Sequence, residues 1–115
     1  MSTLRYSNEQ LFERLIAFVH KELPTGEVCM TMIADHLFLS TSQLNRRVKS
    51  VTGFPVSVFI MNLRIAKAQD LLTHSPNYSM ADIARLCGFA DTAHFSHSFR
   101  RKMGMSPTQY KNSGL

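Results

Sequence analysis

The sequence lacks the features that mark secreted and membrane proteins. Its 115 residues include no tryptophan and only two cysteines, Cys29 and Cys87, which have neither CxxC nor zinc-type spacing. No apolar run approaches the roughly 18 residues that cross a bilayer. The N-terminal MSTLRYSNEQ has no apolar core of the signal-peptide type. We therefore expect a cytoplasmic domain with incidental buried thiols and no membrane contact by this segment.

Motifs for catalysis are also missing. The eight carboxylates form no inward-facing pair, and no GxxxxGK[ST] loop or Ser/His/Asp grouping is present. His94 and His97 stand three apart, but a zinc site needs two further ligands at settled spacing, and the neighbouring Cys87 and Asp91 form no such pattern. We therefore expect no enzyme, no metal site and no cofactor.

Acidic residues become scarce after the first 40 positions. Residues 1–40 contain five acidic and three basic residues (net −2), and residues 41–115 contain three acidic and ten basic residues (net +7), which sum to the chain's +5. A basic segment favours a polyanionic partner, either nucleic acid or an anionic membrane surface. No predicted helix joins a broad apolar face to a polybasic one, so the membrane alternative is the weaker.

The chain contains an internal repeat. MIADHLFLS at 32–40 aligns with DIARLCGFA at 82–90, and after one inserted residue LNRRVKSVTG at 44–53 aligns with FSHSFRRKMG at 95–104. The coinciding apolar pairs are Ile33 and Ile83, Leu37 and Cys87, Leu39 and Phe89, Leu44 and Phe95, and Val48 and Phe99. The repeat predicts two copies of one supersecondary unit.

Each copy is predicted to form two helices joined by a tight turn. In the first, a helix over about 31–37 precedes one that Ser40 caps, with Gln43 in the capping-box position and Gly53 at its end. The expected buried stripe of this second helix is Leu44, Val48 and Val51. In the second copy, Ser79 and Asp91 are the predicted caps of the two helices, and Gly88 makes the turn between them. The second of these helices is expected to bury Phe95 and Phe99 and to end at Gly104.

Longer helices frame the two copies. Ser7 with Gln10 predicts the start of an N-terminal helix, and Ser106-Pro107 opens a short final one. An unbroken helix from Pro55 to about Thr73 is predicted to link the copies, because the stretch has no helix breaker and Phe59, Leu63, Ala66 and Leu71 keep a helical period. The predicted fold is all-α, with seven helices forming two helix-turn-helix subdomains, 7–54 and 76–113, joined by a linker helix at 55–75.

A capped, basic second helix after a tight turn is typical of a helix-turn-helix recognition helix. Asn pairs with adenine and Arg with guanine in the major groove. The residues predicted to read bases are Ser42, Asn45, Arg46, Ala93, His94 and His97. Those predicted to contact phosphates are Ser40, Thr41, Lys49, Thr92, Arg100 and Arg101. A solvated face at 100–102, and a helix-turn-helix scaffold used for protein association, are the alternatives.

The linker length suits a tandem reader of double-stranded DNA. Nineteen helical residues from Pro55 to Thr73 span about 28 Å at 1.5 Å per residue. Successive major grooves on one face of B-DNA lie about 34 Å apart. One chain is therefore long enough to place both recognition helices in successive grooves.

The second copy resembles the signature of AraC/XylS-type bacterial transcription regulators. The stretch IARLCGFADTAHFSHSFRRKMGMSPTQY at 83–110 carries the I-A-x-x-x-G-F, D, F-x-x-x-F, basic and G-x-S-P elements and a final aromatic residue. RIAKAQDLL at 64–72 resembles the linker of the same family, and the resemblance covers about residues 8–112. Two departures stand in the first copy: Phe38 replaces a frequent turn glycine, and Pro55-Val56 replaces Ser-Pro.

The resemblance implies a two-subdomain DNA-binding module that regulates transcription and whose third and sixth helices enter major grooves; the direction of regulation, activation or repression, stays open. It further implies RNA polymerase as a partner, and an N-terminal sensing or dimerisation domain if the sequence is a fragment of a larger regulator, as we expect. LSTSQLNRRVKSVTG at 39–53 also resembles the output domains of hybrid two-component sensors, which would anchor the parent protein in the membrane.

Overall fold

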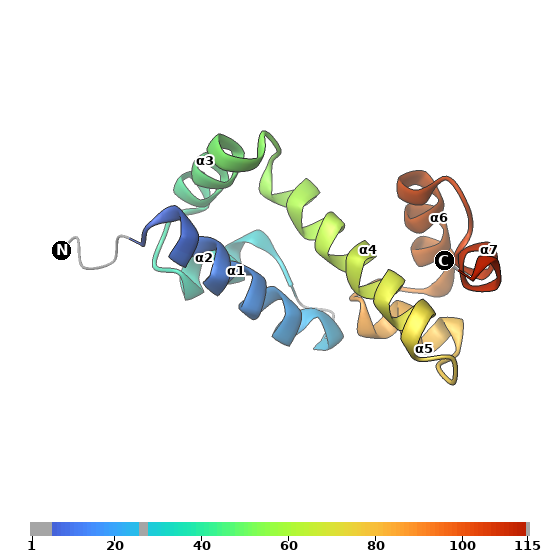
Figure 1. Ribbon diagram of the computed structural model, residues 1–115. Helices are drawn as coiled ribbons and strands as arrows, with labels where there is room; N and C mark the ends of the chain where they lie inside the picture. The colour runs from blue at the N-terminus through green and yellow to red at the C-terminus, as the bar shows by residue number, and fades with distance from the viewer. Residues whose placement is uncertain (1–5, 26–27, 115) are drawn as a thin grey trace. The chain divides into compact units, whose positions relative to one another are not determined.

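The computed structural model describes residues 6–25 and 28–114, and every regular element among them is helical. The elements are α1 (Asn8–Glu22), the 3-10 turn η2 (Leu23–Thr25), α2 (Met30–His36), α3 (Thr41–Thr52), α4 (Val56–His74), α5 (Met80–Leu86), α6 (Thr92–Met103) and α7 (Pro107–Ser113) (Figure 1). The prediction of an all-α fold with seven α-helices is confirmed. No described helix is long and apolar enough to cross a membrane.

The chain forms two compact units, and the division falls inside α4. The first unit contains the described residues up to Glu22 and those from Val28 to Leu63. The second contains Leu23–Thr25 and the described residues from Arg64 onward. The expected segments set 55–75 apart as a linker, whereas the contacts give each half of α4 to one unit.

Because it serves two units, α4 buries different faces in its two halves. Val56 and Ile60 are buried in the first half, and Ile65, Ala68 and Leu72 are buried in the second. At 3.6 residues per turn these two sets do not lie on one stripe. The four residues that keep a helical period in the sequence are not the buried ones: Ala66 is exposed, and Phe59, Leu63 and Leu71 are only partly buried.

The first unit has a core of aliphatic side chains. The predicted capping box starts α1, with Ser7 and Gln10 exchanging hydrogen bonds of 3.1 Å. Helix α1 buries Leu11, Leu15 and Val19, and α3 buries Leu44 and Val48. Val51 was predicted to join this core but is 50% exposed, because it lies in the last turn of α3, beyond the side chains that cover Leu44 and Val48.

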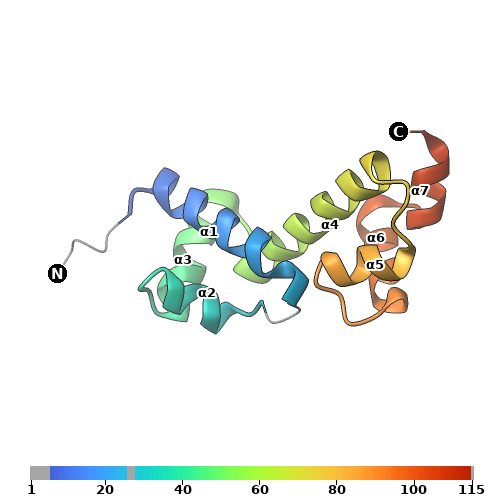
Figure 2. The same ribbon diagram turned by 90° about the horizontal axis from the view of Figure 1, so that it is seen from below.

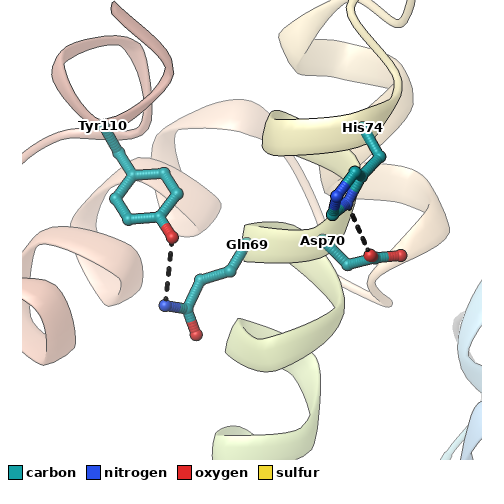
Figure 3. Close-up of polar contacts among 4 residues, drawn as sticks. All are labelled: Gln69, Asp70, His74 and Tyr110. Atoms are coloured by element: carbon teal, nitrogen blue, oxygen red, sulfur yellow. Dashed lines mark hydrogen bonds and ion pairs between the residues drawn. The ribbon is translucent and has the colours of Figure 1, made fainter. Parts of the chain in front are cut away.

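The second unit is held together by aromatic rings. Phe95 and Phe99 of α6 are fully buried, 5.8 Å apart between ring centroids. Phe99 in turn meets Tyr110 of α7 at 5.4 Å in an edge-on contact. The Tyr110 hydroxyl accepts a hydrogen bond of 3.4 Å from Gln69 Nε2 of α4 (Figure 3). Helix α7 therefore connects α6 to α4, and Figure 2 shows α4, α6 and α7 side by side.

Candidate nucleic-acid interface

The two copies have the same backbone pattern. Helices α2 and α5 each have 7 residues, and α3 and α6 each have 12. The turn after α2 closes through a 2.9 Å hydrogen bond from Leu39 N–H to Ala34 O, and the turn after α5 through one of 2.9 Å from Phe89 N–H to Ala84 O. Each unit therefore presents a helix-turn-helix whose second helix is the candidate reader.

Both turns contain a residue with a positive φ, but this residue is different in the two copies. Gly88 has a φ of 84°, and Phe38 at the equivalent position has a φ of 59°. The left-handed conformation costs a residue with a Cβ atom about 1–2 kcal/mol. Phe38 carries that strain and is 63% exposed, whereas the space at Gly88 is closed by Leu23 O, 3.1 Å from where a Cβ would lie.

Helix α3 is fixed at both ends and exposes a polar face. The Ser40 hydroxyl accepts from Gln43 N–H, the Gln43 side chain accepts from Ser40 N–H, and Gly53 ends the helix at a φ of 81°. The candidate contact residues that are exposed on this helix and its cap are Ser40, Thr41, Ser42, Arg46 and Lys49. Their hydroxyl, guanidinium and ammonium groups suit phosphates and base edges.

Two polar residues of α3 are used inside the protein. Asn45 is half-buried, and its Oδ1 accepts a 2.9 Å hydrogen bond from Val56 N–H at the start of α4. Arg47 donates through Nη2 to Tyr6 O at 2.7 Å and to Asn8 Oδ1 at 2.9 Å. The structure therefore separates Asn45 from Ser42 and Arg46, with which the sequence had grouped it.

Helix α6 exposes a comparable face. Asp91 caps it by accepting from His94 N–H at 2.7 Å, and Gly104 ends it at a φ of 80°. The candidate contact residues exposed on it are Thr92, Ala93, His94, His97, Arg100 and Arg101. Apart from Thr92 in the first turn, these exposed side chains lie opposite Phe95 and Phe99, which agrees with a reading face; their individual base and phosphate roles stay predictions.

The two histidines of α6 differ in their surroundings. The His94 ring stands edge-on against Phe89, with centroids 5.3 Å apart, so its position is set by the turn before the helix. His97 lies one turn further on and is exposed. Within residues 6–25 and 28–114, no group of three or more His, Cys, Asp and Glu side chains is placed to hold a metal ion.

A charged residue lies behind the second turn. The Arg64 guanidinium carbon is 5.8 Å from the centroid of the Phe89 ring, in cation–π geometry, and its Nε is buried without a hydrogen-bond partner in the described chain. Burial lowers the pKa of Arg64, and burial likewise raises the pKa of the Cys87 thiol to about 11. Cys87 is fully buried as expected, but Cys29 is exposed, which corrects the expectation of two buried thiols.

The register of the repeat adds one exposed residue of α6 to the candidates for DNA contact. With Gly53 opposite Gly104, Arg46 falls opposite His97, Ser42 opposite Ala93, and Asn45 opposite Ser96. Ser96 is exposed on α6. The alignment of the two copies was sufficient to find Ser96, because the register itself is visible in the sequence.

Comparisons with known proteins agree with this geometry. A family model described as a helix-turn-helix domain matches residues 33–113. The chain is 40% identical over 101 residues to the HTH-type transcriptional activator RhaS of Citrobacter koseri, and 37% identical over 101 residues to RhaS of Salmonella schwarzengrund. Each match covers 88% of this chain but 36% of the relative, so the chain spans about a third of the length of these curated relatives.

Solved structures show the same fold. The DNA-binding domain of AdpA, a global transcriptional factor crystallised with a target DNA, matches with a TM-score of 0.79 and 29% identity over 90% of each chain. An AraC-type regulator from Chromobacterium violaceum matches with a TM-score of 0.82 and 22% identity, over 93% of this chain and 94% of that one. This chain belongs to the AraC-type helix-turn-helix domains, a non-enzymatic family of DNA-binding domains that regulate transcription.

Proposed function

We propose that this domain binds double-stranded DNA as a monomer and inserts α3 and α6 into successive major grooves. The observation that carries the proposal is the repetition of one capped helix-turn-helix in both units, with a polar and basic face on each second helix. Helix α4 runs unbroken from one unit to the other for 19 residues, about 28 Å at 1.5 Å per residue. That length suits neighbouring grooves about 34 Å apart.

The proposed base contacts follow from exposure and register. Arg46, with its guanidinium exposed on α3, reads a guanine, and Ser42 contacts an edge one turn before it. On α6, Ala93 meets a thymine methyl group, and His94 and His97 donate to base edges. The proposed phosphate contacts are Ser40, Thr41, Lys49, Thr92, Arg100 and Arg101.

The proposal also concerns the protein to which this domain belongs. The relatives named RhaS are transcriptional activators, and this chain matches about a third of their length. We therefore propose an output module of a larger cytoplasmic regulator, with a sensing or dimerisation domain and with RNA polymerase as a partner.

The test is selection of binding sites from random duplex DNA, followed by footprinting. We expect a protected region of about 20 base pairs with two sub-sites roughly 10 apart, bound at one protein per duplex. Protection of a single half-site, or binding only as a dimer to a palindrome, would contradict the two-groove arrangement. Failure to prefer any sequence over competitor DNA would favour protein association instead.

A further inference from the structure

The two copies also differ where each candidate reading helix passes into the next helix. In the second unit Ser106 caps α7 in a capping box with Gln109, and Pro107 fills the first helical position. In the first unit Pro55 and Val56 stand at these two positions. Proline offers no side-chain acceptor as a cap, and valine brings a backbone N–H that Pro107 lacks.

Asn45 supplies the acceptor that this junction needs. Its Oδ1 lies 2.9 Å from the N–H of Val56, a fully buried residue. Without Asn45 that N–H would be buried at a helix start with no partner. A backbone N–H only donates, so the atom that faces it is the amide oxygen, and the orientation of the Asn45 side chain follows from its chemistry.

This orientation restricts what Asn45 offers to a base pair. Recognition of adenine by asparagine uses both ends of the planar amide, the oxygen accepting from N6 and the nitrogen donating to N7. In Asn45 the oxygen is directed at the start of α4. The two ends of the amide then cannot face one adenine edge together, and the NH2 group is the end that Val56 does not engage.

We propose that Asn45 contacts DNA as a hydrogen-bond donor only, through its Nδ2 to a major-groove acceptor (a purine N7, guanine O6 or thymine O4), and that it does not recognise adenine. This inference rests on the proposed function, since it requires α3 in the major groove. It replaces the adenine pairing expected from the sequence. Ser96, at the same register of α6, has no side-chain amide, so the inference does not apply to it.

The first part of the test needs no DNA. Asn45→Asp keeps an oxygen for Val56 N–H and removes the NH2 group, whereas Asn45→Ala removes both. We expect the thermal midpoint of Asn45→Asp to match or exceed that of the wild type, because a carboxylate at a helix N-terminus is favourable. Asn45→Ala should have a lower midpoint. Equal losses in both variants would show that the oxygen does not hold Val56.

The second part uses base analogues in a site selected by the wild-type protein. Each analogue removes one group: 7-deazapurines remove N7, 2-aminopurine removes guanine O6, 5-methylpyrimidinone removes thymine O4, and unsubstituted purine removes the adenine amino group. We expect one acceptor deletion to weaken wild-type binding about 3- to 10-fold and to leave Asn45→Asp unaffected. Removal of the amino group should weaken both proteins equally at every adenine.

The matched control is Gln43→Glu, which adds the same charge to α3 and keeps an oxygen on Ser40 N–H. It should lose affinity similarly for all analogues, which measures the cost of charge alone. Coupling of Asn45→Asp to the adenine amino group, or to no base acceptor at all, would overturn the inference while leaving the selected site intact. If the wild-type protein selects no site, the proposed function is wrong and the inference falls with it.

Discussion

Gly88→Ala and Gly104→Ala should lower the free energy of unfolding by different amounts, although both glycines, which belong to the second unit, have a left-handed backbone conformation. Their φ angles are 84° and 80°, so an alanine meets the same backbone strain of about 1–2 kcal/mol at each. Alanine also restricts the unfolded chain, which favours the folded state by about 0.4–1 kcal/mol. The net cost of Gly104→Ala is therefore about 1 kcal/mol, because nothing lies within 4 Å of its added Cβ.

At Gly88 the added Cβ meets Leu23 O at 3.1 Å and Leu23 Cδ2 at 3.2 Å. The oxygen belongs to the backbone of η2, and the Leu23 side chain is fully buried, so neither atom moves easily. Overpacking of this kind costs about 1–3 kcal/mol, which brings Gly88→Ala to about 2–4 kcal/mol.

The assay for this pair is denaturant unfolding followed by far-UV circular dichroism, with Gly53→Ala as a control. Gly53 has a φ of 81° and no atom within 4 Å of an added Cβ, but it lies in the first unit. It should therefore behave like Gly104. Equal losses for Gly88→Ala and Gly104→Ala would refute the close packing of Leu23 against the second turn.

Three further predictions concern DNA binding, thiol chemistry and metal. Arg46→Ala should lose about 1–3 kcal/mol of binding free energy on the selected site and relax the preference at one base pair. Arg101→Ala should weaken binding to all sequences alike and reduce the slope of log affinity against log salt concentration by about one. Equal, sequence-independent losses in the two variants would contradict these roles. Native alkylation should modify exposed Cys29 and spare Cys87. Burial raises the pKa of Cys87 to about 11, against 9.0 for a free thiol, and so favours the protonated thiol in the folded state. The free energy of unfolding of the wild type should therefore fall as the pH rises above 9, by about 1 kcal/mol more at pH 10 than the decrease measured for Cys87→Ala. Chelator should change neither melting temperature nor DNA affinity, and stoichiometric zinc would contradict this.

The local structure of this chain is largely visible in its sequence. Caps act between residues three apart, so Ser7 and Ser40 were identifiable from their spacing to glutamine. Ser106 was identifiable from the proline that follows it, and its capping hydrogen bond is also present. Gly88 was identifiable as the second turn because a left-handed residue is most often glycine. These features depend on a few neighbouring residues, and hence they can be predicted without knowledge of the tertiary structure.

Features that depend on tertiary packing were not visible. Leu23 lies next in sequence to α1, but it packs against Gly88, so it belongs to the second unit. The buried faces of α4 depend on which unit covers each half, and a single periodic stripe does not describe them. The role of Asn45 depends on a residue eleven positions away, at the start of another helix. No local pattern contains that information.

The repeat nevertheless narrows where such long-range ties are found. Where one copy departs from the other, a backbone group that the departure leaves buried needs a partner of its own. Val56 has a backbone N–H at the position where Pro107 has none, and Asn45 of the preceding helix accepts a hydrogen bond from it. The departure of the first copy from its family's pattern is thus the reason that its candidate reading helix has one fewer free amide oxygen than its sequence suggests.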